Sequence, residues 1–218
     1  MNPHPTGRAA GPYDAAFLPR CRMALRAAGQ PAIEPVAKLG GAPCWLSDPT
    51  WPLDPDSGEP LVFVGQFLVP GSDKRLAYLF LHEDDRIWGG IGTEDGDAVL
   101  LIQPGGRIPS HAVIGPPGTR GRSLWRWGPD ETEVPVEWYV DLVPAPEDEA
   151  DQAPEEYVGG VADYAHHAQI DAPWQFFFRL TDCGEAEDDP YFLNFGYGYG
   201  YAFLSPDGGE GRFFWESC

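Results

Sequence analysis

The chain of 218 residues lacks any long apolar run, and none approaches the roughly 18 residues that a membrane-spanning helix needs. Its first seven residues also lack the basic start and apolar stretch of a secretory signal. We therefore expect a cytoplasmic protein that is not membrane-bound.

Basic residues are few, because 14 Lys and Arg stand against 34 Asp and Glu, and the formal net charge is −20. Proteins bind nucleic acids largely by neutralising phosphates with Lys and Arg, so we expect no nucleic-acid partner. The same negative field attracts a basic protein and speeds its encounter with the chain.

Cysteines are also few, and they lie too far apart to predict a zinc knuckle or a disulfide framework. Reduced thiols are therefore expected at all four positions, although the sequence does not reveal their reactivity: Cys21, Cys44, Cys183 and Cys218.

Catalytic and cofactor motifs are missing. No serine lies in a Gly-x-Ser-x-Gly setting, and the glycines at 89–92 are not followed by the Lys-Ser/Thr of a phosphate-binding loop. Asp163 and His167 would share one face of a helix, but no third metal ligand follows nearby. We expect no cofactor and no metal, and the sequence leans against an enzyme.

Glycine and proline, in contrast, are abundant, with 27 and 24 residues, which favours short strands joined by turns. Six apolar segments bounded by Gly, Pro or Asp are predicted strands, and the last two flank a turn and form a terminal hairpin: 61–64, 76–81, 98–102, 136–140, 201–205 and 211–215.

One helix is expected near the N-terminus, with Asp14 as its N-cap and Gly29 as its stop. The reason is the spacing of four and three between apolar residues, the stripe of an amphipathic helix: Phe17, Cys21, Leu25 and Ala28. The predicted class is therefore α+β and β-rich, with mostly antiparallel strands in two pseudo-symmetric modules and one main N-terminal helix.

The domain prediction is a flexible tail at 1–12 and a single domain at 13–218. Within that domain, module one covers about 36–143, an acidic Pro-rich connector covers 144–156, and module two covers 157–218. The modules echo each other: in each, a Gly pair precedes an aromatic residue, a loop and an apolar strand, at 38–67 and at 157–180. This echo indicates an internal duplication.

These segments resemble the YwqG-like family of uncharacterised bacterial proteins. The segments at 38–45, 51–52 and 63–67 are similar to its first signature, those at 158–169 and 174–180 to its second, and 194–203 to its closing glycine-rich strand. Two positions depart from the pattern: Arg179 stands where Gln is expected, and Tyr197 where Asp is common. The resemblance implies a mostly antiparallel β fold with two related modules and a few helices. It implies no established activity, and its link to toxin and immunity gene clusters is an association rather than a mechanism.

Aromatic residues are the best candidates for binding. In a strand at 196–203, the rings of alternate residues would form one face and the glycines the other. The candidate partner- or ligand-binding residues are Trp45, Trp51, Trp174, Tyr197 and Tyr199.

The functional hypothesis is a non-enzymatic binding protein, an immunity-like or antitoxin-like factor that binds a basic partner protein, such as a toxin, through an acidic aromatic surface. We expect a monomer or weak dimer. Two alternatives stay open: a small-molecule or carbohydrate-binding module that uses the aromatic face, and an enzyme whose site is assembled from scattered residues.

Overall fold

Strands are the regular elements of the protein. The structure is a computed structural model that describes residues 19–71, 75–83, 92–145, 155–164, 170–182, 191 and 193–217. Within these ranges there is no helix. The strands are β1 (Cys21–Ala27), β2 (Lys38–Gly40), β3 (Pro52–Leu53), β4 (Val62–Leu68), β5 (Leu76–Leu81), β6 (Ala98–Gln103), β7 (Val113–Ile114), β8 (Trp125–Trp127), β9 (Glu133–Pro135), β10 (Glu137–Pro144), β11 (Tyr157–Val158), β12 (Gln175–Thr181), β13 (Tyr199–Leu204) and β14 (Gly211–Glu216).

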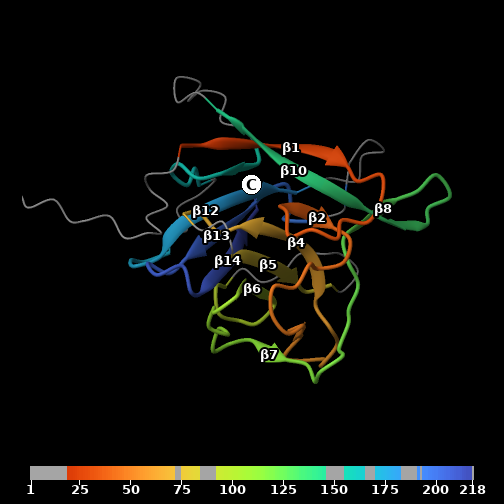
Figure 1. The fold of residues 1–218 in the computed structure, drawn as a ribbon, viewed down its shortest axis with the longest axis horizontal. Coiled ribbons are helices and arrows are strands. Elements are labelled where there is room, and N and C mark those ends of the chain that lie inside the picture. Colours follow the sequence, from red (N-terminus) through yellow and green to blue (C-terminus); the bar gives the residue numbers. More distant parts are fainter. Residues whose placement is uncertain are drawn as a thin grey trace, which may run out of the picture.

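Ten strands form one antiparallel sheet in the order β14-β13-β12-β11-β1-β10-β2-β4-β5-β6. The sheet curls until its two edge strands, β6 and β14, pack against each other (Figure 1). The approach is close, because a Cβ atom added at Gly211 would lie 2.6 Å from a side-chain carbon of Leu100. Two small sheets, β3-β7 and β8-β9, lie outside this ladder.

The predicted N-terminal helix is wrong, and with it the α+β class. Cys21–Ala27 is β1, which pairs along its length with β10 and at its start with β11. A spacing of four residues keeps side chains on one face of a strand as well as of a helix, so Cys21 and Leu25 fit both structures. Met23 decides between them, because it is buried in the same core against which Leu25 packs: a strand places residues 21, 23 and 25 on one face, whereas a helix would turn Met23 to the opposite side.

The β-rich prediction is confirmed, since each of the six predicted strands overlaps a strand of the main sheet. The terminal hairpin is confirmed as well: β13 and β14 pair antiparallel and are joined by residues 205–210. The pattern succeeded here because each segment is short, apolar and bounded by residues that favour turns.

The sheet has the same strand order on both sides of its centre. β1 and β10 pair in the middle, with β2, β4, β5 and β6 beyond β10 and with β11, β12, β13 and β14 beyond β1. We call β1, β2, β4, β5 and β6 the first half of the sheet, and β10 to β14 the second half. The first strand of each half pairs with the second strand of the other half: β1 pairs with β11, and β10 pairs with β2. Register shifts also recur at matching places, between Phe63 and Gly65 in β4 and between Phe176 and Phe178 in β12.

The buried apolar residues form separate clusters on the two faces of the sheet. The inner face carries the largest apolar cluster, to which both halves contribute, including Leu79 and Leu100 from one half and Ala202 and Phe213 from the other. The opposite face carries two smaller clusters, one around Tyr78 and Phe80 and one around Tyr201 and Phe203. Tyr78 and Tyr201 occupy equivalent places, because they pair with Gln66 of β4 and with Arg179 of β12.

Several sequence-based expectations lie outside the described residues, namely the tail at 1–12, most of the connector at 144–156, and His167. In the part of the chain that the structure describes, no helix is long and apolar enough to cross a membrane.

Candidate functional site

The echoing motifs build two equivalent clamps on the outer face of the sheet. In the first clamp, Lys38, Gln66 and Tyr78 hold the loop that follows β2. The Tyr78 hydroxyl donates to the carbonyl of Cys44 at 2.8 Å, and the Cys44 N–H donates to Oε1 of Gln66 at 2.8 Å. Burial raises the pKa of Tyr78, so this hydroxyl stays protonated and keeps its role as a donor.

Lys38 is fully buried, like Gln66 and Tyr78, with an exposed fraction of 0%. Its Nζ donates to the carbonyl of Ala42 at 2.6 Å and to Oε1 of Glu137 at 2.5 Å. A buried ammonium is tolerated only when it is paired and hydrogen-bonded, and both conditions are met here.

In the second clamp, Tyr157, Arg179 and Tyr201 hold the loop that follows β11. The Tyr201 hydroxyl donates to the carbonyl of Asp163 at 3.2 Å, and Nη1 of Arg179 donates to the same carbonyl at 3.0 Å. The N–H of Asp163 donates to the hydroxyl of Tyr157 at 2.9 Å. Arg179 thus takes the place of Gln66. Gln66 bonds to the backbone of Cys44, whose carbonyl accepts from Tyr78. Arg179 bonds to the backbone of Asp163, whose carbonyl accepts from Tyr201.

The glycine pairs lead into both clamps with the same backbone conformation. Gly40 and Gly41 have φ of +70° and +65°, and Gly159 and Gly160 have φ of +75° and +71°. These left-handed angles strain any residue with a Cβ atom, which explains why glycine stands there twice in each module. The motifs shared by the modules therefore fix loops to the sheet rather than form a binding surface.

Two of the predicted binding residues pack in the smaller cluster around Tyr78 and Phe80. Trp45 stacks on Tyr78 with ring centroids 4.9 Å apart, and Trp51 is buried, its indole N–H donating to the carbonyl of Leu61 at 2.7 Å. Trp51 is thus closed to a partner, and half-buried Trp45 has one ring face covered by Tyr78.

Trp174 and Tyr199 are half-buried, and each is covered by an arginine of the same half. The guanidinium of Arg212 lies 4.5 Å from the ring centroid of Trp174, and that of Arg179 lies 4.2 Å from the centroid of Tyr199. Both arginines are buried, so these cation–π contacts belong to the packed interior.

Tyr197 differs from the other four candidates because its exposed fraction is 85%. It precedes β13 rather than lying within it, and its φ of +64° is left-handed. Its N–H donates to Oδ2 of Asp182 at 2.7 Å, which pins the backbone in this conformation. Of the predicted binding residues, Tyr197 is the one whose ring is freely presented to solvent.

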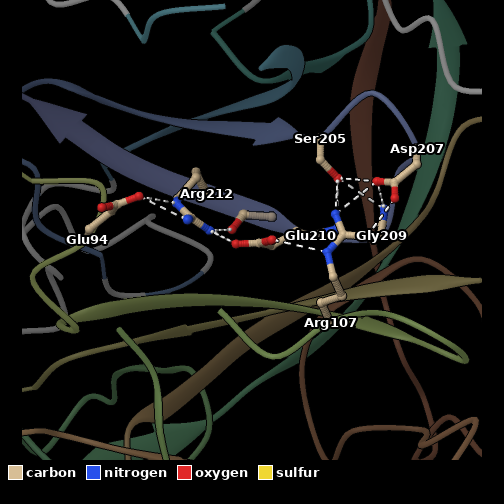
Figure 2. A network of polar contacts seen from close by, with 8 residues as sticks. Glu94, Arg107, Ser205, Asp207, Gly209, Glu210 and Arg212 are labelled. Atoms are coloured by element: carbon tan, nitrogen blue, oxygen red, sulfur yellow. Dashed lines mark hydrogen bonds and ion pairs between the residues drawn. The ribbon is translucent and has the colours of Figure 1, made fainter. Parts of the chain in front are cut away.

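A network of ion pairs crosses the place where the edges of the sheet meet (Figure 2). Arg212 on β14 contacts Glu94 at 2.9 Å and Glu210 at 2.6 Å, and Arg107 contacts Asp207 at 2.5 Å. Hydrogen bonds from Arg107 hold the pKa of the Asp207 carboxyl well below its usual range. The network ties the loop after β6 to the turn between β13 and β14, which is a structural role.

Many of the Lys and Arg side chains are neutralised by ion pairs within the protein, so the surface charge of the described residues is set mainly by exposed carboxylates without an ion-pair partner. Ion pairs involve Arg26, Lys38, Arg107, Arg122, Arg179 and Arg212. Among the described residues, no ion pair involves the exposed carboxylates of Glu34, Asp48, Asp56, Glu59, Asp130, Glu131 and Asp171. The accessible charge is therefore mainly negative.

His82 and Asp54 form the pair most similar to catalytic machinery, with Nδ1 of His82 2.7 Å from Oδ2 of Asp54. A nucleophile would have to contact the histidine, but the Ser57 hydroxyl donates to Oδ1 of Asp54, at 2.8 Å. Burial raises the pKa of Asp54, but the hydrogen bonds from Ser57 and the nearby His82 together outweigh it and hold this pKa below its ordinary value. The order of these three groups does not match a Ser-His-Asp triad.

Metal ligands are not grouped in the described part of the chain, where no three His, Cys, Asp or Glu side chains form a candidate metal site. Comparison with protein families, curated proteins and solved structures finds no match to this chain. Membership of the YwqG-like family therefore stays a prediction.

Proposed function

We propose that this chain is a non-enzymatic binding protein, an immunity-like or antitoxin-like factor that holds a basic partner protein through its acidic surface, with Tyr197 as an anchor. The observation that carries this proposal is the exposed ring of Tyr197 on a left-handed backbone.

A tyrosine is a costly choice at this position. A left-handed conformation costs an L-residue with a Cβ atom about 1–2 kcal/mol, whereas Gly or Asn adopts it readily. The ring is exposed, so burial offsets little of this cost. Strain of this kind tends to occur at functional sites, and tyrosine is enriched among the residues that dominate binding energy.

The charge supports a basic partner. A net charge of −20 attracts a cationic protein over a distance set by screening, which is about 8 Å at physiological salt. Association with such a partner should therefore slow as salt rises, while dissociation, which depends on short-range contacts, should respond less.

The carbohydrate alternative has less support, because a sugar-binding platform needs several exposed rings. Trp51 is buried and Trp45 stacks on Tyr78, so Tyr197 alone of the predicted rings is largely exposed.

The test uses basic proteins encoded next to the gene of this chain, with association and dissociation rates measured across salt concentrations. Tyr197→Asn should raise the dissociation rate roughly 5- to 150-fold, the equivalent of about 1–3 kcal/mol. The same variant should raise the melting temperature by a few degrees, since it relieves backbone strain.

Asp171→Asn is the matched control, because it removes an exposed carboxylate of the same half without touching Tyr197. The proposal fails if the association rate does not depend on salt and Tyr197→Asn dissociates no faster than the control.

A further inference from the structure

The β8–β9 hairpin is a small arm that the sequence analysis did not single out. Its strands pair only with each other in the described structure, as a two-stranded sheet outside the main ladder. Figure 1 shows its turn extending beyond the body of the molecule, on the side away from β12 and β13. Trp127, on this arm, has an exposed fraction of 46%.

The arm is held firmly at its base. The indole N–H of Trp125 donates to Oε1 of Glu83 at 3.0 Å, and Nη1 of Arg122 contacts both carboxylate oxygens of Glu83 at 3.0 Å. Arg122 also pairs with Glu133 of β9. Trp127 packs edge-on against Trp125 with ring centroids 4.8 Å apart, so little entropy is lost when a partner contacts its outer part.

The turn of the arm is acidic. Asp130 and Glu131 are exposed and have no ion pair within the described part of the chain. Glu131 adopts a left-handed backbone with φ of +53°, and the hydrogen bond from the N–H of Gly128 to the carbonyl of Thr132, at 2.7 Å, closes the turn. Two unpaired carboxylates thus follow Trp127 by three and four residues.

The protein already uses aromatic rings and carboxylates together to hold guanidinium groups. Arg212 lies over Trp174 and bonds to Glu94, and Arg122 lies 5.9 Å from the ring centroid of Trp125 and bonds to Glu83. A cation is stabilised by the electron-rich face of a ring and by a nearby carboxylate together. The arm carries the same types of side chain, the ring of Trp127 and the carboxylates of Asp130 and Glu131, on an exposed element.

We propose that the arm is a docking element for an arginine- or lysine-bearing segment of a basic protein. One cationic side chain of the partner lies against the ring of Trp127, and the carboxylates of Asp130 and Glu131 pair with it or with its neighbours. This inference rests on the proposed function for the basic nature of the partner, but it assigns the contact to a surface other than Tyr197.

The test is a titration of the full chain, labelled with ¹⁵N, with a tetra-arginine peptide blocked at both ends. The indole N–H signal of Trp127 is assigned by its loss in Trp127→Phe. We expect this signal to shift saturably, and Asp130→Asn/Glu131→Gln to weaken the apparent affinity roughly threefold to tenfold. A tetra-glutamate peptide should leave the signal in place.

Glu34→Gln/Asp48→Asn is the control, because it removes the same number of exposed charges outside the arm. Equal weakening in both double variants would mean that only the overall charge attracts the peptide, and would overturn the proposal. An unmoved Trp127 signal would overturn it as well. Melting temperatures equal to that of the wild type show that each variant is folded.

The two proposals fail in different ways. Tyr197→Asn should leave the tetra-arginine titration of Trp127 unchanged, and a change would refute a separate docking element. If the arm variants bind the peptide normally while Tyr197→Asn still loses the basic protein, the proposed function stands and the arm proposal falls.

Discussion

Replacing Gly40 by alanine should destabilise the protein far more than the same change at Gly58. Both glycines have left-handed backbones, with φ of +70° and +76°. A Cβ atom at Gly40 would lie 2.0 Å from the carbonyl oxygen of Val136, whereas one at Gly58 would meet nothing within 4 Å. The pair therefore separates the cost of the backbone angle from the cost of the clash.

The expected magnitudes follow from these contacts. Gly58→Ala should lower the free energy of unfolding by about 1–2 kcal/mol, the cost of the left-handed angle. Gly40→Ala adds overpacking of about 1–3 kcal/mol. Relaxing the clash also endangers the 2.9 Å hydrogen bond from the Gly41 N–H to the Val136 carbonyl. That bond contributes about 0.5–1.5 kcal/mol, so we expect a loss of about 3–6 kcal/mol in all.

The assay is urea unfolding followed by circular dichroism, with melting temperatures as a second measure. A loss of this size should lower the melting temperature by roughly 6–24 °C for a chain of this length. Equal losses for Gly40→Ala and Gly58→Ala would refute the argument, since the close approach of β2 to the segment before β10 would then have no energetic role.

Three further outcomes are expected. Lys38→Met should cost about 3–5 kcal/mol in urea unfolding because it leaves Glu137 without its partner, and Glu137→Gln should cost at least as much because it leaves the fully buried ammonium of Lys38 without a counter-charge; a much smaller loss for Glu137→Gln would contradict this account. Burial raises the pKa of Glu156, so its contribution to stability is present below about pH 4.3 and is lost as pH rises through the raised value; Glu156→Gln should flatten that part of a stability–pH curve, and parallel curves would refute it. A chain cut between residues 145 and 155 should remain one particle in gel filtration because β1 pairs with β11 and β6 packs against β14 across the cut, and separation of the pieces would show that these two contacts do not hold them together.

Local patterns predicted most of the sheet because its strands carry their own signals. β5 and β6 are short apolar runs bounded by turn residues, and a fully buried strand has that composition in any context. The same reasoning failed for Cys21–Ala27, whose apolar spacing fits a helix and a strand alike. What decided between them was pairing with β10, more than 100 residues away in the sequence, which satisfies the backbone groups of β1 along its length.

The candidate binding residues also separate into properties that the sequence determines and properties that only the tertiary structure decides. The sequence alone determined that the protein is acidic, rich in aromatic residues and built from two echoing segments. It could not determine which rings are exposed, because exposure depends on what the fold places over each ring. Trp45 lies against Tyr78, Arg212 covers Trp174, and Trp127 is carried outward by a hairpin, so tertiary packing, which joins residues distant in the chain, decided which aromatic residues a partner can reach.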